Sequence, residues 1–414
     1  MKLSSLPTKS LRETTKKFDS KSHELLLRGG YVDQVASGIF SFLPLGLRVL
    51  NKVENIIRQE LNAFDAQEVI LPKLQPKSAW EATKRWDSVD VLYRVISKHE
   101  HEYALDLSAE EMVCLMAKNY IRSYRDLPLC LYQIGPKFRD EARAKSGILR
   151  GREFRMKDAY SFHSSPIEFE KYYEEMKALY LQIYAKMGFT DVKVTEASGG
   201  IFSKNNSHEF NVLTPAGEVD LVYYEDETIA YNEEVVTDKL MSDLQKKGEV
   251  KKGKAIEIGN IFSLGTKFSK DFDLVYTDDG GRERLVQMGC YGIGTSRILG
   301  ALVEVNHDSD GIIWPRNVAP FQVHLVNLNK DSGYAGVVYR TLLSQGVEVL
   351  YDDREGVGNG EKLTTADFLG IPLRLIVSEK TGKDVEVKER TEEKTHLVTL
   401  ESLKNLIFDY YQSS

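Results

Sequence analysis

Hydrophobic residues recur every three or four positions in the segment from Leu45 to Phe64. The apolar side chains stand at positions 47, 50, 53, 56, 57 and 61. This spacing predicts an amphipathic helix over 45–64 with one face buried in a core. The short apolar run from Glu68 to Pro72 that follows predicts a strand.

Two further apolar runs, 129–138 and 152–162, predict strands on either side of a loop that is rich in arginine. The segment 164–188 predicts a capped helix. Ser165 is a suitable N-cap because Pro166 follows it in the first turn, and Gly188 stands just beyond the last turn.

The stretch 237–254 has a different character. It carries lysines at positions 239, 246, 247, 251, 252 and 254 and has no strong apolar period beyond one or two short helical turns, which favours a surface connection. Beyond it, 255–265 and 283–294 are strand-like and 295–305 is helical. Pro315 and Pro320 then mark a domain boundary.

After Pro320, strand-like and helix-like segments alternate to the end of the chain. The alternation includes the apolar runs FQVHLVNL, VEVLYDD and LRLIVS, with helices of roughly ten residues between them. This pattern predicts a small mixed or parallel α/β domain over 320–414, so the fold class is α/β.

The length of 414 residues suits two or three domains of about 150 residues each. With 42% hydrophobic and 28% charged residues, the composition is that of a globular protein. The net charge of −7 argues against non-specific coating of nucleic acid. Three cysteines without a C-x-x-C pair predict neither a disulfide framework nor a structural zinc site. No apolar run is long enough to span a membrane or to form a signal core, so a cytoplasmic location is expected.

The arginine-rich loop is the first candidate site. Arg139 and Glu141 stand at its start, and Arg150 and Phe154 stand at its end. Such a set can bind a nucleotide, with Arg139 on a phosphate oxygen, Glu141 accepting from the adenine amino group and Phe154 stacked on the ring. A solvated hairpin with surface salt bridges explains the same residues about equally well.

The second candidate is the glycine-rich strand that precedes the helix carrying Arg297. Glycines at positions 289, 292 and 294 would let a flat ligand approach the backbone, and a helix start favours anions. The glycine order is not that of a dinucleotide fold, and close packing of the helix on the sheet explains it as well.

Two shorter motifs have ordinary structural explanations. His208 and Glu209 could form a catalytic patch, but a structural hydrogen-bonded pair is the more common outcome. Ser108 before Glu110 and Glu111 is, locally, a helix N-cap with acids in the first turn.

Taken in order, these segments resemble the class II aminoacyl-tRNA synthetases, and most closely the prolyl-tRNA synthetases of the bacterial type. The most specific strings are MKDAYSFH at 156–163 and MGCYGIG at 288–294. The resemblance also runs through 28–72, 207–210 and 256–268, and it continues through DDREGVGNGEKLTTADFLGIP near the C-terminus.

The resemblance implies a class II synthetase antiparallel sheet flanked by helices, in an α+β catalytic domain over 1–236 and 255–319. A short connection at 237–254 would replace an editing insertion, and 320–414 would be the anticodon-binding domain. The implied reaction uses ATP with Mg²⁺ to activate proline and then transfers prolyl to tRNA(Pro).

In this family, Arg139 and Arg297 are the implied catalytic residues, because they would offset negative charge on the α- and γ-phosphates. The whole implied ATP-binding set is Arg139, Glu141, Arg150, Phe154 and Arg297.

The resemblance also implies a proline pocket. A carboxylate beside a hydroxyl would bind the secondary ammonium of proline, and apolar side chains would contact its ring. The implied set is Ser108, Glu110, Phe162, His163, Glu209 and Cys290.

The sequence departs from the family pattern around this pocket. Residues 106–109 are Asp-Leu-Ser-Ala where glycine-proline-threonine-histidine is usual, Asn260 stands where histidine is usual, and the glycine-rich lead-in at 199–206 is altered. The changed loop at 106–109 leaves open a class IIa enzyme for another amino acid. A synthetase-like binding subunit without aminoacylation activity is the other alternative.

Further partners are implied by the family. A homodimer is expected, and residues 235–254 are too few for the editing domain of many bacterial relatives. The chain is therefore expected not to deacylate alanyl-tRNA in cis, and a separate trans-editing deacylase would be a partner. Anticodon contacts are expected from Arg354, Lys362 and Arg374, although ordinary surface charges explain each of them equally well.

Overall fold

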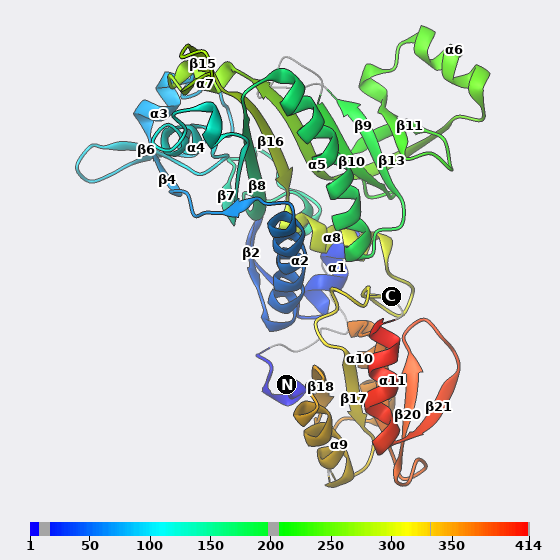
Figure 1. The fold of residues 1–414 in the computed structure, drawn as a ribbon. Coiled ribbons are helices and arrows are strands. Elements are labelled where there is room, and N and C mark those ends of the chain that lie inside the picture. The colour runs from blue at the N-terminus through cyan, green and yellow to red at the C-terminus, as the bar shows by residue number, and fades with distance from the viewer. Residues whose placement is uncertain (8–16, 198–206, 332, 413–414) are drawn as a thin grey trace. The chain divides into compact units, whose positions relative to one another are not determined.

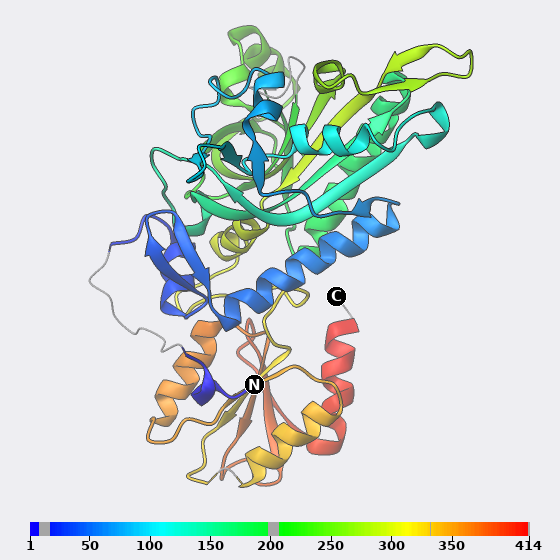
Figure 2. The same ribbon diagram turned by 90° about the vertical axis from the view of Figure 1, so that its left-hand side faces the viewer.

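The structure is a computed structural model that describes residues 1–7, 17–197, 207–331 and 333–412. Two compact units make up the chain (Figures 1 and 2). The large unit comprises Ala36–Ile39 and Glu54–Ala301, and the small unit comprises Met1–Val35, Phe40–Val53 and Leu302–Ser414. The altered lead-in at 199–206 lies outside the described residues.

The large unit is built on a sheet that has nine strands in the part of the chain described. Its strands, in spatial order, are β10 (Ser207–Leu213), β9 (Val192–Ala197), β12 (Ile229–Asn232), β11 (Val219–Tyr223), β13 (Lys251–Gly265), β16 (Gln287–Ile293), β8 (Glu153–His163), β7 (Leu129–Phe138) and β3 (Gln67–Glu68). The central strands β13, β16, β8 and β7 pair antiparallel. A further pairing of β10 with β13 closes β13, β11, β12, β9 and β10 into a ring.

The strands predicted on either side of the arginine-rich loop are confirmed as β7 and β8, but the strand predicted over 68–72 is wrong. Gln67 and Glu68 pair with β7, and the Val69 N–H still donates to the carbonyl of Tyr132 at 2.8 Å, but the pairing ends there. The backbone N–H of Leu71 donates instead to the side chain of Gln133 at 3.2 Å, and Ile70 is 92% exposed. A side chain thus replaces the backbone ladder at this edge of the sheet.

Helix α5 (Pro166–Met187) covers one face of the sheet and has the predicted caps. The side chain of Ser165 accepts from the Glu168 N–H, and Gly188 adopts a left-handed conformation with φ of 97°. A left-handed residue at this position satisfies the last carbonyls of a helix, and glycine adopts it without steric cost.

The other face of the sheet packs an apolar cluster against α4 (Glu110–Ala117) and α7 (Lys267–Asp271). Beside this cluster lie α3 (Lys77–Ala82) and a small sheet of β4 (Leu74–Pro76), β6 (Glu102–Leu105) and β5 (Arg94–Ile96). A separate pair is formed by β14 (Val275–Thr277) and β15 (Glu283–Leu285).

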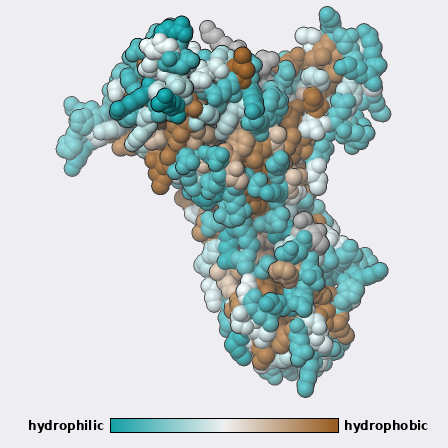
Figure 3. Space-filling model, in the orientation of Figure 1, coloured by the Kyte–Doolittle hydropathy of each residue, from teal (hydrophilic) through white to brown (hydrophobic). Residues whose placement is uncertain are grey.

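The stretch 237–254 is more ordered than its sequence indicated. Residues Asp238–Lys247 form helix α6, and Lys251 begins strand β13. The helix is anchored by the buried Leu244, whose carbonyl accepts from the Tyr224 hydroxyl at 2.7 Å. Its other side chains are mostly exposed and polar, as the hydrophilic surface at this end of the large unit shows (Figure 3). The helix is also capped at its start, where the Thr237 side chain accepts from the Leu240 N–H.

The small unit contains the predicted mixed α/β domain. Its sheet has the order β18 (Val349–Asp352), β17 (Val323–Asn327), β19 (Leu373–Val377), β20 (Asp384–Glu389) and β21 (Thr395–Thr399). The first three strands are parallel and the last two antiparallel. Helices α9 (Gly333–Ser344), α10 (Asn359–Leu369) and α11 (Leu400–Gln412) accompany this sheet.

The remaining elements precede or adjoin this domain in sequence, namely α1 (Lys21–Arg28), β1 (Val32–Ala36), β2 (Ile39–Phe42), α2 (Pro44–Ala63) and α8 (Thr295–Val305). The helices predicted over 45–64 and 295–305 are confirmed as α2 and α8. Among the described residues, no helix combines the length and the apolar character that crossing a membrane requires.

The compact units divide the chain differently from the expected domains, because the first 35 residues group with the C-terminal region. The Tyr31 hydroxyl, for example, donates to the carbonyl of Leu369 at 2.6 Å and accepts from the indole of Trp314 at 2.8 Å. Such long-range hydrogen bonds cannot be read from a local pattern.

Candidate active site

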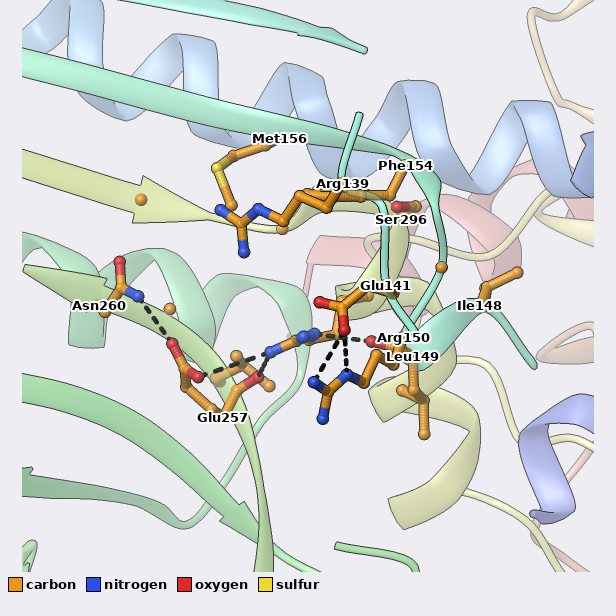
Figure 4. Close-up of a pocket in the computed structure, with 16 residues that line it drawn as sticks. Arg139, Glu141, Ile148, Leu149, Arg150, Phe154, Met156, Glu257, Asn260 and Ser296 are labelled. Carbon is orange, nitrogen blue, oxygen red and sulfur yellow. Dashed lines mark hydrogen bonds and ion pairs between the residues drawn. The ribbon is translucent and has the colours of Figure 1, made fainter. Parts of the chain in front are cut away.

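A pocket in the large unit brings the two sequence candidates together (Figure 4). The loop between β7 and β8 forms one wall, and β13, β16 and the start of α8 form the others. All five residues expected to bind ATP line it, namely Arg139, Glu141, Arg150, Phe154 and Arg297. Their convergence favours a binding site over a solvated hairpin.

Arg139 presents a cation to this pocket. Its guanidinium carbon lies 5.1 Å from the centroid of the Phe154 ring. Among the described residues, no group forms a hydrogen bond or ion pair with this guanidinium. Burial lowers the pKa of Arg139, and the nearby charge of Arg297 lowers it further. An anionic ligand would relieve both costs.

Arg150 and Glu141 close the arginine-rich loop on itself. Glu141 accepts from Arg150 at 3.1 and 2.8 Å, and this hydrogen bonding raises the pKa of Arg150. The backbone carbonyl of Glu141 also accepts from Arg152 at 3.0 Å. These contacts fix the loop conformation and hold the Glu141 carboxylate at the pocket wall.

Arg297 is oriented by backbone carbonyls, and it lies beside an acid that the sequence analysis missed. It donates to the carbonyl of Leu149 at 2.8 Å and to that of Glu257 at 3.1 Å. The Glu257 carboxylate lies 3.6 Å from the guanidinium and accepts from Asn260 at 2.8 Å (Figure 4).

A β-bulge explains why both Glu257 and Asn260 line the pocket. Residues three apart in a regular strand face opposite sides of a sheet. The register of β13 against β10 shifts here, since Phe210 pairs with Gly259 and Asn211 with Glu257. The extra residue restores a common face, which strict alternation could not have indicated.

The glycines of β13 and β16 serve close packing as well as the pocket. A Cβ on Gly292 would lie 2.8 Å from the side-chain oxygen of Asn260, and one on Gly259 would lie 2.1 Å from the Tyr184 hydroxyl. Both alternatives considered for the glycine-rich strand hold, because Gly292 lines the pocket and a Cβ on Gly289 would lie 2.7 Å from the Phe169 ring of helix α5.

A second group of predicted residues meets around Glu110, which is fully buried. One of its oxygens accepts from the Ser108 hydroxyl at 2.7 Å and from the Cys290 thiol at 3.4 Å. Phe162 and Cys290 belong to one apolar cluster, which also contains Phe262. The structure thus combines a buried carboxylate, a hydroxyl and an apolar wall.

The interpretation of Ser108 as a helix N-cap is wrong. The N-cap residue of α4 is Ala109, and no side chain caps this end of the helix. The Ser108 hydroxyl is directed to Glu110 instead.

His163 does not join this group. Adjacent strand residues face opposite sides of a sheet, so Phe162 and His163 diverge. His163 packs against Phe169 and Tyr172 of α5, with ring centroids 5.6 and 4.9 Å away. Neither ring nitrogen has a hydrogen-bond partner among the described residues, and burial lowers the pKa of His163 to about 4.

Glu209 lies beside the first pocket. It is opposite Asn260 in the β10–β13 pairing, and burial together with Glu257 raises the pKa of Glu209 to about 8. Its neighbour His208 contacts the Tyr173 hydroxyl at 2.9 Å, so the expected pair of His208 with Glu209 is wrong.

Arg85 is a further residue that no motif indicated. It is 4% exposed and donates to Glu110 at 3.2 Å and to Glu111 at 2.9 Å. Burial raises the pKa of Glu111 to about 7, against the opposing effect of Arg85. Arg85 donates to one carboxylate oxygen of Glu110 and Ser108 donates to the other, so both fix the position of this carboxylate.

The three expected anticodon residues all have partners within the small unit. Arg354 donates to Asp352 at 2.9 and 2.7 Å, and Arg374 donates to Asp367 at 2.7 Å. Lys362 is only 5% exposed and donates to a backbone carbonyl at 2.8 Å, so its expected role as a surface contact is wrong. Burial of its ammonium was not visible in the sequence.

Comparison with known proteins places the chain in a class. Residues 93–306 match the family "tRNA synthetase class II core domain (G, H, P, S and T)", and residues 322–409 match the family "Anticodon binding domain". With the antiparallel sheet and its pocket, these matches define a class II aminoacyl-tRNA synthetase.

Full-length relatives identify the family within this class. The proline–tRNA ligase of Wolbachia sp. subsp. Brugia malayi is 39% identical over 98% of this chain and 99% of the relative. That of Caulobacter vibrioides is 38% identical over 95% and 96%. The chain belongs to the proline–tRNA ligase family.

A solved structure has the same fold. It is the prolyl-tRNA synthetase from Cryptosporidium parvum complexed with L-proline and AMP, at 19% identity and a TM-score of 0.77. The similarity covers 95% of this chain and 75% of that chain.

Proposed function

We propose that this chain activates proline with ATP to prolyl-adenylate in the pocket of Arg139 and Arg297, and then transfers prolyl to tRNA(Pro). The observation that carries the proposal is that the two arginines, which are far apart in sequence, line one pocket. The buried pair of Ser108 and Glu110 supplies a separate site for an ammonium group.

The activation step needs no side-chain base, because the proline carboxylate is already a nucleophile. Arg139 would contact the α-phosphate, where charge develops, and Arg297 would contact the γ-phosphate. Preorganised cations and alignment of the reactants supply catalysis of this kind.

We propose that Mg²⁺ enters with ATP and that Glu257 and Asn260 hold it. Carboxylate and amide oxygens are suitable ligands for this ion, and both side chains line the pocket. When bound, Mg²⁺ would offset the negative charge of the phosphates. The proposal includes no structural zinc.

Proline would bind with its ammonium on Glu110 and Ser108, and its ring against Phe162 and Cys290. A charged hydrogen bond to a buried carboxylate is strong, and the apolar wall matches the ring. Glu209 remains proposed at the edge of the site, whereas His163 is excluded by its position.

For the transfer step we propose that 320–414 binds the anticodon. Arg354 and Arg374 stay proposed contacts, because their side chains are 20% and 13% exposed. We further propose the catalytic domain over 1–236 and 255–319, a homodimer and a cytoplasmic location.

We also propose that alanyl-tRNA is not deacylated in cis. The chain between β12 and β13 holds helix α6, which is ten residues long, in place of a further domain. Because alanine lacks methylenes that proline has, the pocket rejects it by only about 10- to 200-fold. A separate trans-editing deacylase would then hydrolyse the alanyl-tRNA(Pro) that this chain forms by error.

Charging of a tRNA(Pro) transcript with radiolabelled proline tests the proposed function. The purified chain is expected to charge this transcript and to lose most activity on a transcript with a changed anticodon. A folded chain that charges no transcript with proline would contradict the proposal.

A further inference from the structure

A buried ionic network holds the loop that joins β6 to α4. Asp106, the first residue of this loop, is fully buried. Its carboxylate accepts from Lys137 at 2.9 Å on both oxygens, and from Lys73 at 2.9 Å. Lys137 is also fully buried and donates at 2.9 Å to Asp158. Two carboxylates thus balance two ammonium groups inside the large unit.

The same network reaches the far end of the loop. Asp158 accepts a hydrogen bond from the Tyr160 hydroxyl at 2.9 Å. That hydroxyl in turn accepts from the backbone N–H of Ala109 at 2.9 Å. Since Ala109 directly precedes Glu110, the network holds the loop on both sides of Ser108.

Backbone contacts and Gln75 complete the attachment. The N–H of Asp106 donates to the carbonyl of Lys73 at 2.9 Å, and the N–H of Phe138 donates to the carbonyl of Asp106 at 2.9 Å. The side chain of Gln75 donates to the Asp106 carboxylate at 3.2 Å and to the carbonyl of Ser108 at 3.3 Å. Lys73 and Gln75 therefore bind both the Asp106 side chain and the backbone of the loop.

A buried ion pair of this kind contributes little net stability, because desolvation offsets the attraction. Its geometry, however, is strictly defined, because the Lys137 ammonium donates to both oxygens of Asp106 and to one oxygen of Asp158. Lys137 precedes Arg139 by two residues, so the end of β7 carries both the anchor of the loop and the phosphate-binding arginine.

We propose that Asp106 is a positioning residue for proline, which acts through Lys137 to hold Ser108 and Glu110 in the geometry that binds the ammonium. The inference rests on the proposed function of the Ser108–Glu110 pair.

Two variants of the full-length chain test the proposal. Asp106→Asn with Lys73→Met removes the anchor and keeps the charges balanced, because Lys137 and Asp158 still pair. Tyr160→Phe removes only the hydroxyl that holds the far end of the loop. The matched control is Glu102→Gln, since Glu102 is an exposed carboxylate on β6 that pairs with Lys77 at 2.6 Å.

The measured quantities are the KM values for proline and for ATP in ATP–pyrophosphate exchange. We expect the double variant to raise the KM for proline about 10- to 100-fold, because small misplacements of binding groups have effects of this size. Tyr160→Phe should raise the KM for proline at least threefold, and the KM for ATP should stay within about twofold in both variants. The control should match the wild type.

Equal changes in both KM values, or an unchanged KM for proline in a folded variant, would overturn the inference. If the double variant does not fold, as judged by thermal melting, Asp106→Asn alone takes its place, and the same two outcomes for the KM values decide. A wild-type chain without proline-dependent exchange would instead refute the proposed function, so the two failures are distinguishable.

Discussion

Arg139→Ala is expected to remove most activation activity without loss of the fold. The guanidinium has no hydrogen-bond or ion-pair partner among the described residues, so the substitution breaks no such contact of the free protein. A phosphate would form one or two charged hydrogen bonds with it, worth about 1.5–3 kcal/mol each. The expected loss is therefore about 1.5–6 kcal/mol, or about 10-fold to 3 × 10⁴-fold in kcat/KM.

The stability of the free protein should change little. Removal of Arg139 relieves the repulsion by Arg297 and costs only the contact with the Phe154 ring, which is worth about 0.5–1 kcal/mol. The free energy of unfolding should thus stay within about 1 kcal/mol of the wild-type value. Stabilisation by ATP, about 2.7 kcal/mol at a hundredfold excess over Kd in the wild type, should be lost at the same ATP concentration.

Two assays check these expectations, namely proline-dependent ATP–pyrophosphate exchange and thermal melting with and without ATP. The matched control is Arg143→Ala, because Arg143 lies in the same loop, is exposed and does not line the pocket. Exchange within a factor of three of the wild type, or unfolding of Arg139→Ala, would refute the reasoning.

Three further predictions concern pH, editing and assembly. Burial lowers the pKa of His163 to about 4, so the native state binds fewer protons than the unfolded state between about pH 6.5 and 4, and stability is lost as pH falls through this window. Because of His163, the free energy of unfolding should be about 2 kcal/mol lower at pH 5 than at pH 7.5. Urea unfolding of His163→Phe should lack this decrease. The same pH dependence in the variant and the wild type would contradict the prediction. The purified chain should leave alanyl-tRNA(Pro) intact, and rapid hydrolysis would refute the absence of cis editing. Sedimentation equilibrium should give twice the chain mass of 47.0 kDa, and a monomer at micromolar concentration would contradict the proposed dimer.

Elements with strong local signals were predictable from the sequence. Helix α5 has an N-cap serine, a proline in its first turn and a left-handed glycine at its end, and all three signals act within a few residues. The apolar period likewise defined α2. Helix α6 also has local signals, namely the N-cap Thr237 and Gly248 after its last turn, and it was missed because the lysine-rich composition was interpreted as a surface connection.

The candidate site was predictable where it coincides with family motifs, and not where it depends on packing. Arg85 and Asp106 are recognisable only once buried partners from other helices and strands surround them. Glu257 faces the pocket because of a β-bulge, which no alternation pattern indicates. Strand alternation alone argues against the prediction that His163 lines the proline pocket together with Phe162, since adjacent strand residues face opposite sides of a sheet.

The most direct test is ATP–pyrophosphate exchange by the purified wild-type chain with each of the twenty amino acids in turn. The account predicts strong exchange with proline and a much weaker signal with alanine. Silence with every amino acid, or a dominant signal from one other than proline, would contradict it.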